Sequence, residues 1–298
     1  MKLNTIFTLP FLPFKTCFYW NKSINKTIPG KQFARYGFNL GLKLLLKGKL
    51  SLKLLFNPVS IVRYFEYDFA DYCIGNINEK DILDVSSPHL FGFFITSTTK
   101  CKYHYVNPDS KDLQNVKSLV SKLKFKGDYF TDCVDATKLP YPGNSFDRIV
   151  SISVIEHVNN NGDSEVMREM WRALKPGGLL ILTFPVKNDY EEEFVSRDIY
   201  NLNREETNGK FFFQRYYNDK KIEERLLSSI NNFEIVEKKV FGEITNGFYN
   251  TYKKKWEKSG YWETVKDPYY ISKHFKYFPG IKDLTGLGVM GLTIKKLA

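Results

Sequence analysis

The sequence lacks the features of a disulfide-stapled, metal-bound or membrane-spanning protein. Its four cysteines, Cys17, Cys73, Cys101 and Cys133, lie far apart, and none forms a C-x-x-C pair. This spacing provides neither a disulfide framework nor a cysteine metal site, and it favours a reducing compartment. No apolar run reaches the roughly 18 residues that a membrane-spanning helix needs. We therefore expect a cytoplasmic protein with no resident metal.

The first 65 residues also lack Asp and Glu. They carry nine Lys and two Arg, whereas the remainder has 33 basic and 33 acidic residues. The excess positive charge therefore lies in the N-terminal segment, where it can meet anionic lipid or another acidic partner. Residues 37–56 alternate leucine and lysine, as helices do that lie on a membrane surface or pack on their own protein. We expect packing, with peripheral membrane contact as the alternative.

Strand and helix patterns alternate along the rest of the chain. Apolar residues three and four apart predict helices near 60–73, up to about 98, and over 109–123, 163–175 and 219–230. Short apolar runs predict strands over 81–85, 102–106, 127–136, from 146, and over 179–186, 233–241 and 286–297. Because several strands are apolar on both faces, the pattern is typical of an α/β fold, a parallel sheet covered by helices on both sides.

An insertion separates the last two predicted strands. Residues 242–285 are rich in Tyr, Trp and Lys, and an insertion of this length is more often functional than passive. We expect a lid over an acceptor site, with an aromatic structural cap as the alternative. The chain then divides into a basic helical extension, residues 1–78, that packs on the core, and a main domain, residues 79–298, that contains the insertion.

Polar or small residues follow the first four predicted strands, beginning at Asp84, Asn107, Asp135 and Ser153. In an open parallel sheet, ligands bind beyond the carboxyl ends of the strands. Any one of these residues alone is also typical of a turn. The four together predict a ligand site.

Two longer stretches identify the kind of site. They are VDATKLPYPGNSFDRIVSISVIEHV (134–158) and MREMWRALKPGGLLILTFPV (167–186). With the strand that ends in Asp84, they resemble the class I S-adenosylmethionine-dependent methyltransferases, most closely the branch that methylates small molecules. The resemblance covers about residues 80–186 well and 210–241 weakly. It implies a Rossmann-like sheet of seven mostly parallel strands, the last one antiparallel, and S-adenosyl-L-methionine as cofactor.

The resemblance also implies roles for individual residues. Asp84 would orient the loop that receives the methionine part of the cofactor. Asp135 would accept a hydrogen bond from the adenine amino group, and the backbone of Ala136 would lie beside the ring. Ser153 and Val154 would line the cofactor near its sulfur.

Two positions depart from the family pattern. The loop LDVSSPHLFG has Ser86, Ser87 and Pro88 where the family has a glycine-rich turn. The two hydroxyls can bond a carboxylate or an ammonium, whereas the proline removes a backbone donor. At the end of the second strand, Asn107 with Asp109 stands where the family has an acid that binds the ribose. We expect these five residues to contact the cofactor by altered chemistry.

Methyl transfer requires an aligned nucleophile and the exclusion of water, and a hydroxyl nucleophile also requires a base. His157, next to Glu156, is the predicted base, and stabilisation of the loop by this pair is the alternative. His89, His104 and His274 are weaker candidates. We predict methylation of a small-molecule or glycan-linked acceptor, at oxygen.

Two other function classes stay open. One is a degenerate, non-catalytic methyltransferase fold that binds a membrane surface or a partner. The other is a nucleic-acid methyltransferase, since D-P-Y-Y at 267–270 resembles the D-P-P-Y motif of adenine-amino methyltransferases. That motif should directly follow the fourth strand, and here it lies in the insertion. We interpret it as a turn.

Overall fold

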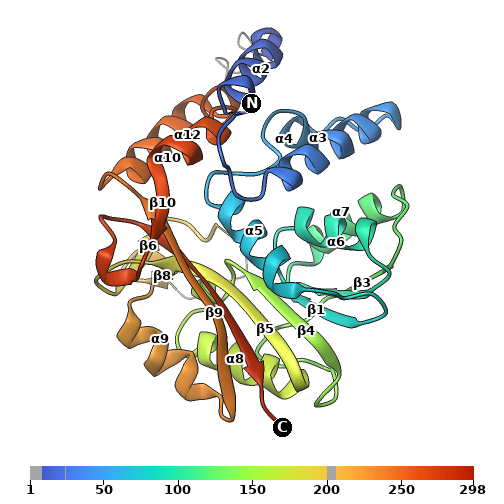
Figure 1. Cartoon of the computed structure of the whole chain (residues 1–298), viewed down its shortest axis with the longest axis vertical. Coiled ribbons are helices and arrows are strands. Elements are labelled where there is room, and N and C mark those ends of the chain that lie inside the picture. The colour runs from blue at the N-terminus through green and yellow to red at the C-terminus, as the bar shows by residue number, and fades with distance from the viewer. Residues whose placement is uncertain (1–8, 24, 200–205) are drawn as a thin grey trace. The chain divides into compact units, whose positions relative to one another are not determined.

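The structure is a computed structural model that describes residues 9–23, 25–199 and 206–298 (Figure 1). The chain forms two compact units. Unit 1 contains Met1–Phe69, Phe241–Phe278 and Leu284–Leu287, and unit 2 contains Ala70–Val240, Pro279–Asp283 and Gly288–Ala298. Unit 1 thus joins the N-terminal segment to most of the insertion. The first eight residues of the predicted extension lie outside the described residues, and its packing on the core stays a prediction.

Unit 2 is built on a mostly parallel sheet. A strand forms at each predicted run, with β3 shorter and β5 longer than predicted: β1 (Asp81–Val85), β2 (Lys102–Val106), β3 (Asp128–Asp132), β4 (Phe146–Ile152), β5 (Leu174–Val186), β9 (Phe233–Glu243) and β11 (Gly288–Lys296). Strands β1 to β5 pair in parallel, and β11 runs antiparallel to β5. The predicted α/β fold with an antiparallel last strand is therefore confirmed.

The predicted number of strands is wrong. The sheet has eight strands in the order β10-β9-β11-β5-β4-β1-β2-β3, not seven. The additional strand is β10 (Phe275–Phe278), which comes from the predicted insertion. It has only four residues, and its two central side chains, Lys276 and Tyr277, are exposed. Such a run has neither the length nor the alternation that predicts a strand.

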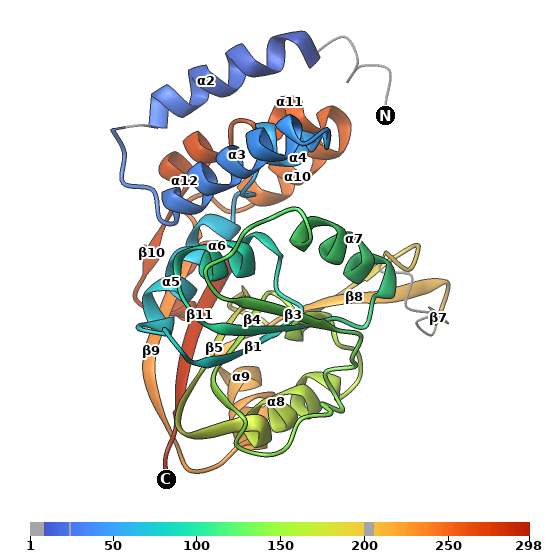
Figure 2. The same ribbon diagram turned by 90° about the vertical axis from the view of Figure 1, so that its right-hand side faces the viewer.

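Helices cover both faces of the sheet, as predicted. Figure 2 shows α6 (Leu90–Thr98) and α7 (Ser110–Val120) on one face, with α8 (Gly162–Ala173) and α9 (Asp219–Arg225) on the other. The strand segments at the centre are almost completely buried, as in β4 and β11. Burial on both sides explains why these strands are apolar on both faces.

A second, three-stranded sheet lies in unit 2, in a stretch where we predicted no strand. It consists of β6 (Glu191–Val195), β7 (Glu206–Thr207) and β8 (Lys210–Tyr216), paired antiparallel in the order β6-β8-β7. Strand β6 begins with three glutamates, and Glu is depleted in strands. Its pairing with β8 therefore overrides the local preference.

Unit 1 is helical, apart from its share of the sheet. Its helices are η1 (Leu9–Phe11), α2 (Leu12–Ser23), α3 (Lys31–Leu46), α4 (Leu52–Phe56), the start of α5 (Arg63–Ile74), α10 (Phe248–Ser259), α11 (Tyr261–Thr264) and α12 (Asp267–His274). Among the described residues, no helix is both long and apolar enough to cross a bilayer. The D-P-Y-Y segment forms the first turn of α12, with Asp267 fully buried.

Stability should depend on pH through Asp267. This carboxyl accepts hydrogen bonds from Tyr252 Oη at 2.8 and 3.0 Å and from Asn57 Nδ2 at 3.2 Å. Burial nevertheless raises the pKa of Asp267 well above its usual value. The folded state therefore keeps its proton while the unfolded chain loses it. The resulting stabilisation is complete below about pH 4 and is lost as pH rises toward the folded pKa, by up to about 1.4 kcal/mol per pH unit.

Asp267→Asn should remove this pH dependence, because the amide does not titrate. Urea unfolding of the wild type and the variant across the acidic-to-neutral range measures the difference. The free energy of unfolding of the wild type should fall relative to that of the variant as pH rises. Parallel pH profiles would show that Asp267 does not hold its proton on folding.

Candidate cofactor site

The carboxyl ends of β4, β1, β2 and β3 are neighbours in the sheet, and hydrogen bonds continue beyond them. The amide of Asn107 donates to the carbonyl of Asp132 at 3.2 Å, and Val134 N donates back to the carbonyl of Asn107 at 3.3 Å. Ser153 N donates to the Thr183 carbonyl of β5 at 2.9 Å. The backbone thus brings together the segments that hold the predicted site residues.

The loop after β1 is bonded to both neighbouring strands. Ser86 has a φ of 56°, in the left-handed region that glycine favours. Its amide and its hydroxyl both donate to the carbonyl of Val106 in β2, each at 2.9 Å. Ser87 Oγ accepts from Ile152 N in β4 at 3.0 Å. The loop keeps a glycine-like turn at Ser86, and both hydroxyls hold the loop itself, ahead of Pro88.

Asp84 lies beneath this loop, fully buried. Its Oδ1 accepts from Ser87 N at 2.9 Å, and its Oδ2 accepts from Tyr103 Oη at 2.5 Å. Burial raises the pKa of Asp84, whereas hydrogen bonds from Ser87 and Tyr103 act in the opposite direction. The Asp84 carboxyl therefore accepts a hydrogen bond from a backbone amide of the loop, and its role toward the cofactor stays a prediction.

Tyr103 is a site residue that we did not single out from the sequence. Its ring lies against Gly92 of α6, where an added Cβ would come within 2.7 Å of a ring carbon. Glycine at this position lets the tyrosine reach Asp84. The available signal was the alternation of Tyr103 and Tyr105 along β2, which places both rings on one face.

At the end of β2, the side chain of Asn107 is held on three sides. Its Nδ2 donates to Tyr105 Oη and to Asp112 Oδ2, each at 2.9 Å. Its Oδ1 accepts from Asp109 N at 2.9 Å. Asp109 in turn caps α7, because its Oδ1 accepts from Lys111 N and from the amide of Asp112.

Asp112 is a second residue that the sequence did not single out. Besides Asn107, it contacts His89 Nε2, at 2.9 Å from Oδ2 and 3.0 Å from Oδ1. His89 Nδ1 is buried and has no hydrogen-bond partner among the described residues. His89, Asp112 and Asn107 are thus linked by hydrogen bonds beside the loop after β1. Because His89 and Asp112 are far apart in sequence, no local motif predicts their contact.

Asp135 and Ala136 lie in the loop that follows β3, because this strand ends at Asp132 and is shorter than predicted. Asp135 is exposed, and its Oδ1 accepts from Thr137 N at 2.9 Å and Thr137 Oγ1 at 2.8 Å. Ala136 is buried. The pair therefore combines an accessible carboxylate with a small buried neighbour.

The segment after β4 holds the predicted base. Ser153 has a φ of 50° and leads through Val154 into the short helix η2 (Ile155–His157). His157 Nδ1 lies 2.8 Å from the Phe213 carbonyl of β8, and Nε2 lies 3.7 Å from Oε1 of the buried Glu156. A carbonyl oxygen only accepts, so Nδ1 carries the hydrogen in this contact.

The weaker histidine candidates lie elsewhere. His104 stacks on Phe130 with ring centroids 4.8 Å apart, and burial lowers its pKa. His274 belongs to unit 1 and stacks on Phe248 at 4.0 Å. Within the described part of the chain, no group of three or more His, Cys, Asp or Glu side chains is placed to hold a metal ion.

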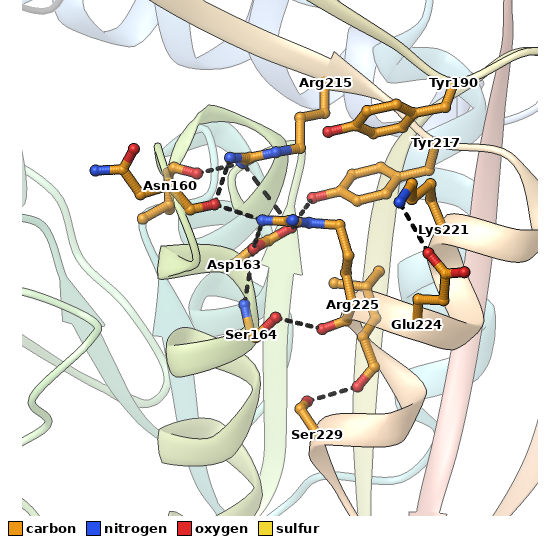
Figure 3. Close-up of polar contacts among 12 residues, drawn as sticks. Asn160, Asp163, Ser164, Tyr190, Arg215, Tyr217, Lys221, Glu224, Arg225 and Ser229 are labelled. Atoms are coloured by element: carbon orange, nitrogen blue, oxygen red, sulfur yellow. Dashed lines mark hydrogen bonds and ion pairs between the residues drawn. The ribbon is translucent and has the colours of Figure 1, made fainter.

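A buried ionic network fixes the chain that follows η2 (Figure 3). Arg215 of β8 is buried and donates to the carbonyls of Val158 and Asn160. Asp163, also buried, accepts from Arg225 at 2.7 and 2.8 Å and from Tyr217 Oη at 2.9 Å. Because the partners are more than 50 residues apart in sequence, no spacing rule predicts them.

Parts of the chain are similar to known methyltransferases. Residues 90–182 match a family model described as a methyltransferase domain. A stretch of 51 residues is 47% identical to the methyltransferase GfsG of Streptomyces halstedii, which is 17% of this chain and 18% of that protein. Another of 78 residues is 38% identical to the ubiquinone/menaquinone biosynthesis C-methyltransferase UbiE of Pseudoalteromonas translucida (strain TAC 125), 26% of this chain and 30% of that protein.

Both matched stretches span less than a third of the relative's length. Among solved structures, the MccD protein matches with a TM-score of 0.52 and 11% sequence identity, over 80% of this chain and 99% of that chain. At this identity the likeness concerns the fold alone. With the family match, it confirms the resemblance and the cofactor class that the sequence predicted. Residues 90–182 thus resemble the S-adenosylmethionine-dependent methyltransferases, and the fold agrees with that resemblance.

Proposed function

We propose that this protein transfers a methyl group from S-adenosylmethionine to a small-molecule acceptor. The observation that carries the proposal is the hydrogen-bonded convergence of four strand ends, with Asp84 near the end of β1 and with Asp135 and His157 in the segments that follow β3 and β4. The carboxyl edge of an open parallel sheet is where ligands bind in this class of fold. The family match over residues 90–182 supports the same chemistry.

The residues at this edge suit the cofactor. The left-handed turn at Ser86, braced by Asp84, keeps the backbone course that a glycine would supply. The exposed carboxylate of Asp135 is a suitable acceptor for the adenine amino group, with Ala136 beside the ring. For the ribose hydroxyls we assign Asn107, through the remaining lone pair of its Oδ1, and Asp109.

When bound, this cofactor supplies an electrophilic methyl group on a sulfonium. The chain's own residues then have to place the acceptor near Ser153 and Val154, exclude water and take up a proton. His157 is suited to the last task. Because its Nδ1 donates to the Phe213 carbonyl, Nε2 is the nitrogen that accepts a proton in the neutral ring. A base in this tautomer is compatible with a hydroxyl acceptor, free or glycan-linked, and we propose O-methylation as the first candidate.

A carbon acceptor is the second candidate. The observation in its favour is the 38% identity to a protein named as a C-methyltransferase, over 78 residues. An acidic carbon also needs a base, so His157 would serve either reaction. The identity of the methylated atom in the product distinguishes them.

The proposed function is tested by turnover with a panel of hydroxylated small molecules, with the methylated product and the demethylated cofactor detected by mass spectrometry. His157→Gln should lower the rate about 10²–10⁴-fold without changing cofactor affinity, since general base catalysis contributes about that much. His104→Gln is the matched control, because this ring stacks on Phe130 in the sheet. An unchanged rate in His157→Gln would contradict the assigned base.

A further inference from the structure

Unit 1 holds the positive charge of the protein. Its segments contain 18 Lys and Arg against six Asp and Glu, a formal charge of +12, whereas unit 2 has 26 against 27. Methyl transfer to a small molecule does not call for such an asymmetry. A surface with this charge attracts polyanions or anionic lipid.

Exposed apolar side chains lie among these charges on η1 and α2. Phe11, Phe14 and Phe18 are spaced by three and four residues, so they lie on one side of the helical segment. They are 61%, 77% and 52% exposed. We call these three residues the phenylalanine ridge. Such rings are unusual on a water-facing surface unless something covers them.

The other side of α2 is anchored within unit 1. Leu12 and Ser23 are buried, and the Tyr19 ring lies 5.8 Å from Tyr269 of α12. Lys15 Nζ donates to the Trp262 carbonyl at 2.5 Å and lies 3.5 Å from the centroid of the indole ring. Figure 2 shows α2 as the outermost helix of this unit. The phenylalanine ridge is therefore the solvent-exposed side of a helical segment whose other side packs within unit 1.

A second exposed apolar group lies at the end of α3 and in the segment directly after it. Its members are Leu42, Leu45, Leu46 and Leu50, which we call the leucine face; Leu46 is 89% exposed. Lys43, Lys47 and Lys49 alternate with them in sequence. On α2, likewise, Lys22 Nζ lies 4.5 Å above the ring of Phe18. Apolar side chains flanked by lysine stems are the pattern of a helix that lies in a membrane interface.

From this pattern we infer that unit 1 binds the surface of an anionic lipid bilayer. The phenylalanine ridge and the leucine face would enter the headgroup region, with the neighbouring lysines on the phosphates. A second copy of the chain suits this surface less well, because it would bring +12 against +12. Nucleic acid would use the charges and stack on phenylalanine, but leucine offers no stacking face. This binding requires neither cofactor nor acceptor.

Vesicle flotation with the full chain tests the inference. Wild-type protein should bind vesicles of phosphatidylcholine mixed with phosphatidylglycerol, bind pure phosphatidylcholine at least about tenfold more weakly, and dissociate in high salt. Phe11→Ser, Phe14→Ser and Phe18→Ser combined should lower the partition coefficient on the order of a hundredfold. Combined Lys43→Gln, Lys47→Gln and Lys49→Gln should have an effect of similar size, at about fivefold per charge.

Two variants of unit 2 serve as matched controls and should bind like the wild type. Ile235→Ser with Val236→Ser removes comparably exposed apolar side chains from β9, and Lys111→Gln, Lys117→Gln and Lys124→Gln removes three exposed charges. Circular dichroism and thermal unfolding verify that each variant is folded.

Three results would overturn the inference. The first is the absence of binding to the mixed vesicles. The second is retention of binding by the phenylalanine variant together with competition by a single-stranded oligonucleotide, which would indicate a polyanion site. The third is a wild-type dimer that this variant converts to a monomer in sedimentation, which would assign the ridge to a second copy.

Discussion

Replacing Asp84 with alanine should lower the affinity for S-adenosylmethionine by about a hundredfold or more. The substitution removes the acceptor of Ser87 N and of Tyr103 Oη, at 2.9 and 2.5 Å, and leaves both donors buried. Each such loss costs about 1–3 kcal/mol, so two of them can release the loop. The free energy of unfolding should fall by a similar total. Calorimetric titration and urea unfolding measure the two effects separately.

Tyr103→Phe is the matched control for this experiment. It removes one of the two contacts and leaves the loop amide of Ser87 bonded to Asp84. Cofactor affinity should then change far less than in Asp84→Ala, because the contact that holds the loop is kept. Equal affinities in Asp84→Ala and the wild type would mean that Asp84 has only a packing role.

Replacing Asp163 with alanine should lower the free energy of unfolding by about 3–5 kcal/mol, the usual effect of removing one partner from a buried ion pair. Asp163 is fully buried, and Arg225 and Tyr217 donate to it directly (Figure 3). Without the Asp163 carboxylate, the Arg225 guanidinium loses its ion-pair partner and the Tyr217 hydroxyl loses its hydrogen-bond acceptor. Denaturant unfolding followed by far-ultraviolet circular dichroism measures the change.

Glu224→Ala is the matched control for Asp163→Ala, because it removes a carboxylate from an exposed ion pair. Glu224 accepts from Lys221 Nζ at 2.8 Å on an exposed part of α9, directly before Arg225 in sequence. Exposed ion pairs contribute little to stability because water screens them. This variant should unfold like the wild type. A loss in Asp163→Ala no larger than that in Glu224→Ala would contradict the importance of the buried network.

The elements with clear local patterns were predicted well from the sequence. Strands β1 and β2 match the predicted ranges, because each is a short run of mainly strand-forming residues between polar turns. Strand β6 was not, because its three glutamates become a strand only by pairing with β8. Strand β10 was missed because four residues are too few to show a period.

The candidate site divides in the same way. Positions at strand ends, such as Asp84 and Asp135, follow from the order of strands and turns and needed no coordinates. Hydrogen bonds between residues far apart in sequence could not be predicted. Ser87 Oγ accepts from Ile152 N, 65 residues away, and His157 Nδ1 donates to the Phe213 carbonyl, 56 residues away. The serine hydroxyls were predicted to contact the cofactor, which stays a prediction; in the structure they form hydrogen bonds with the neighbouring strands.

Isothermal titration of the wild-type protein with S-adenosylmethionine and its demethylated product tests the central claim most directly. If the four strand ends form a working cofactor site, both should bind with a Kd on the order of micromolar or tighter, about −8 kcal/mol. Asp135→Ala should weaken both, because it removes the proposed adenine acceptor. A folded wild-type protein that binds neither compound would contradict the account and leave the methyltransferase fold as a scaffold.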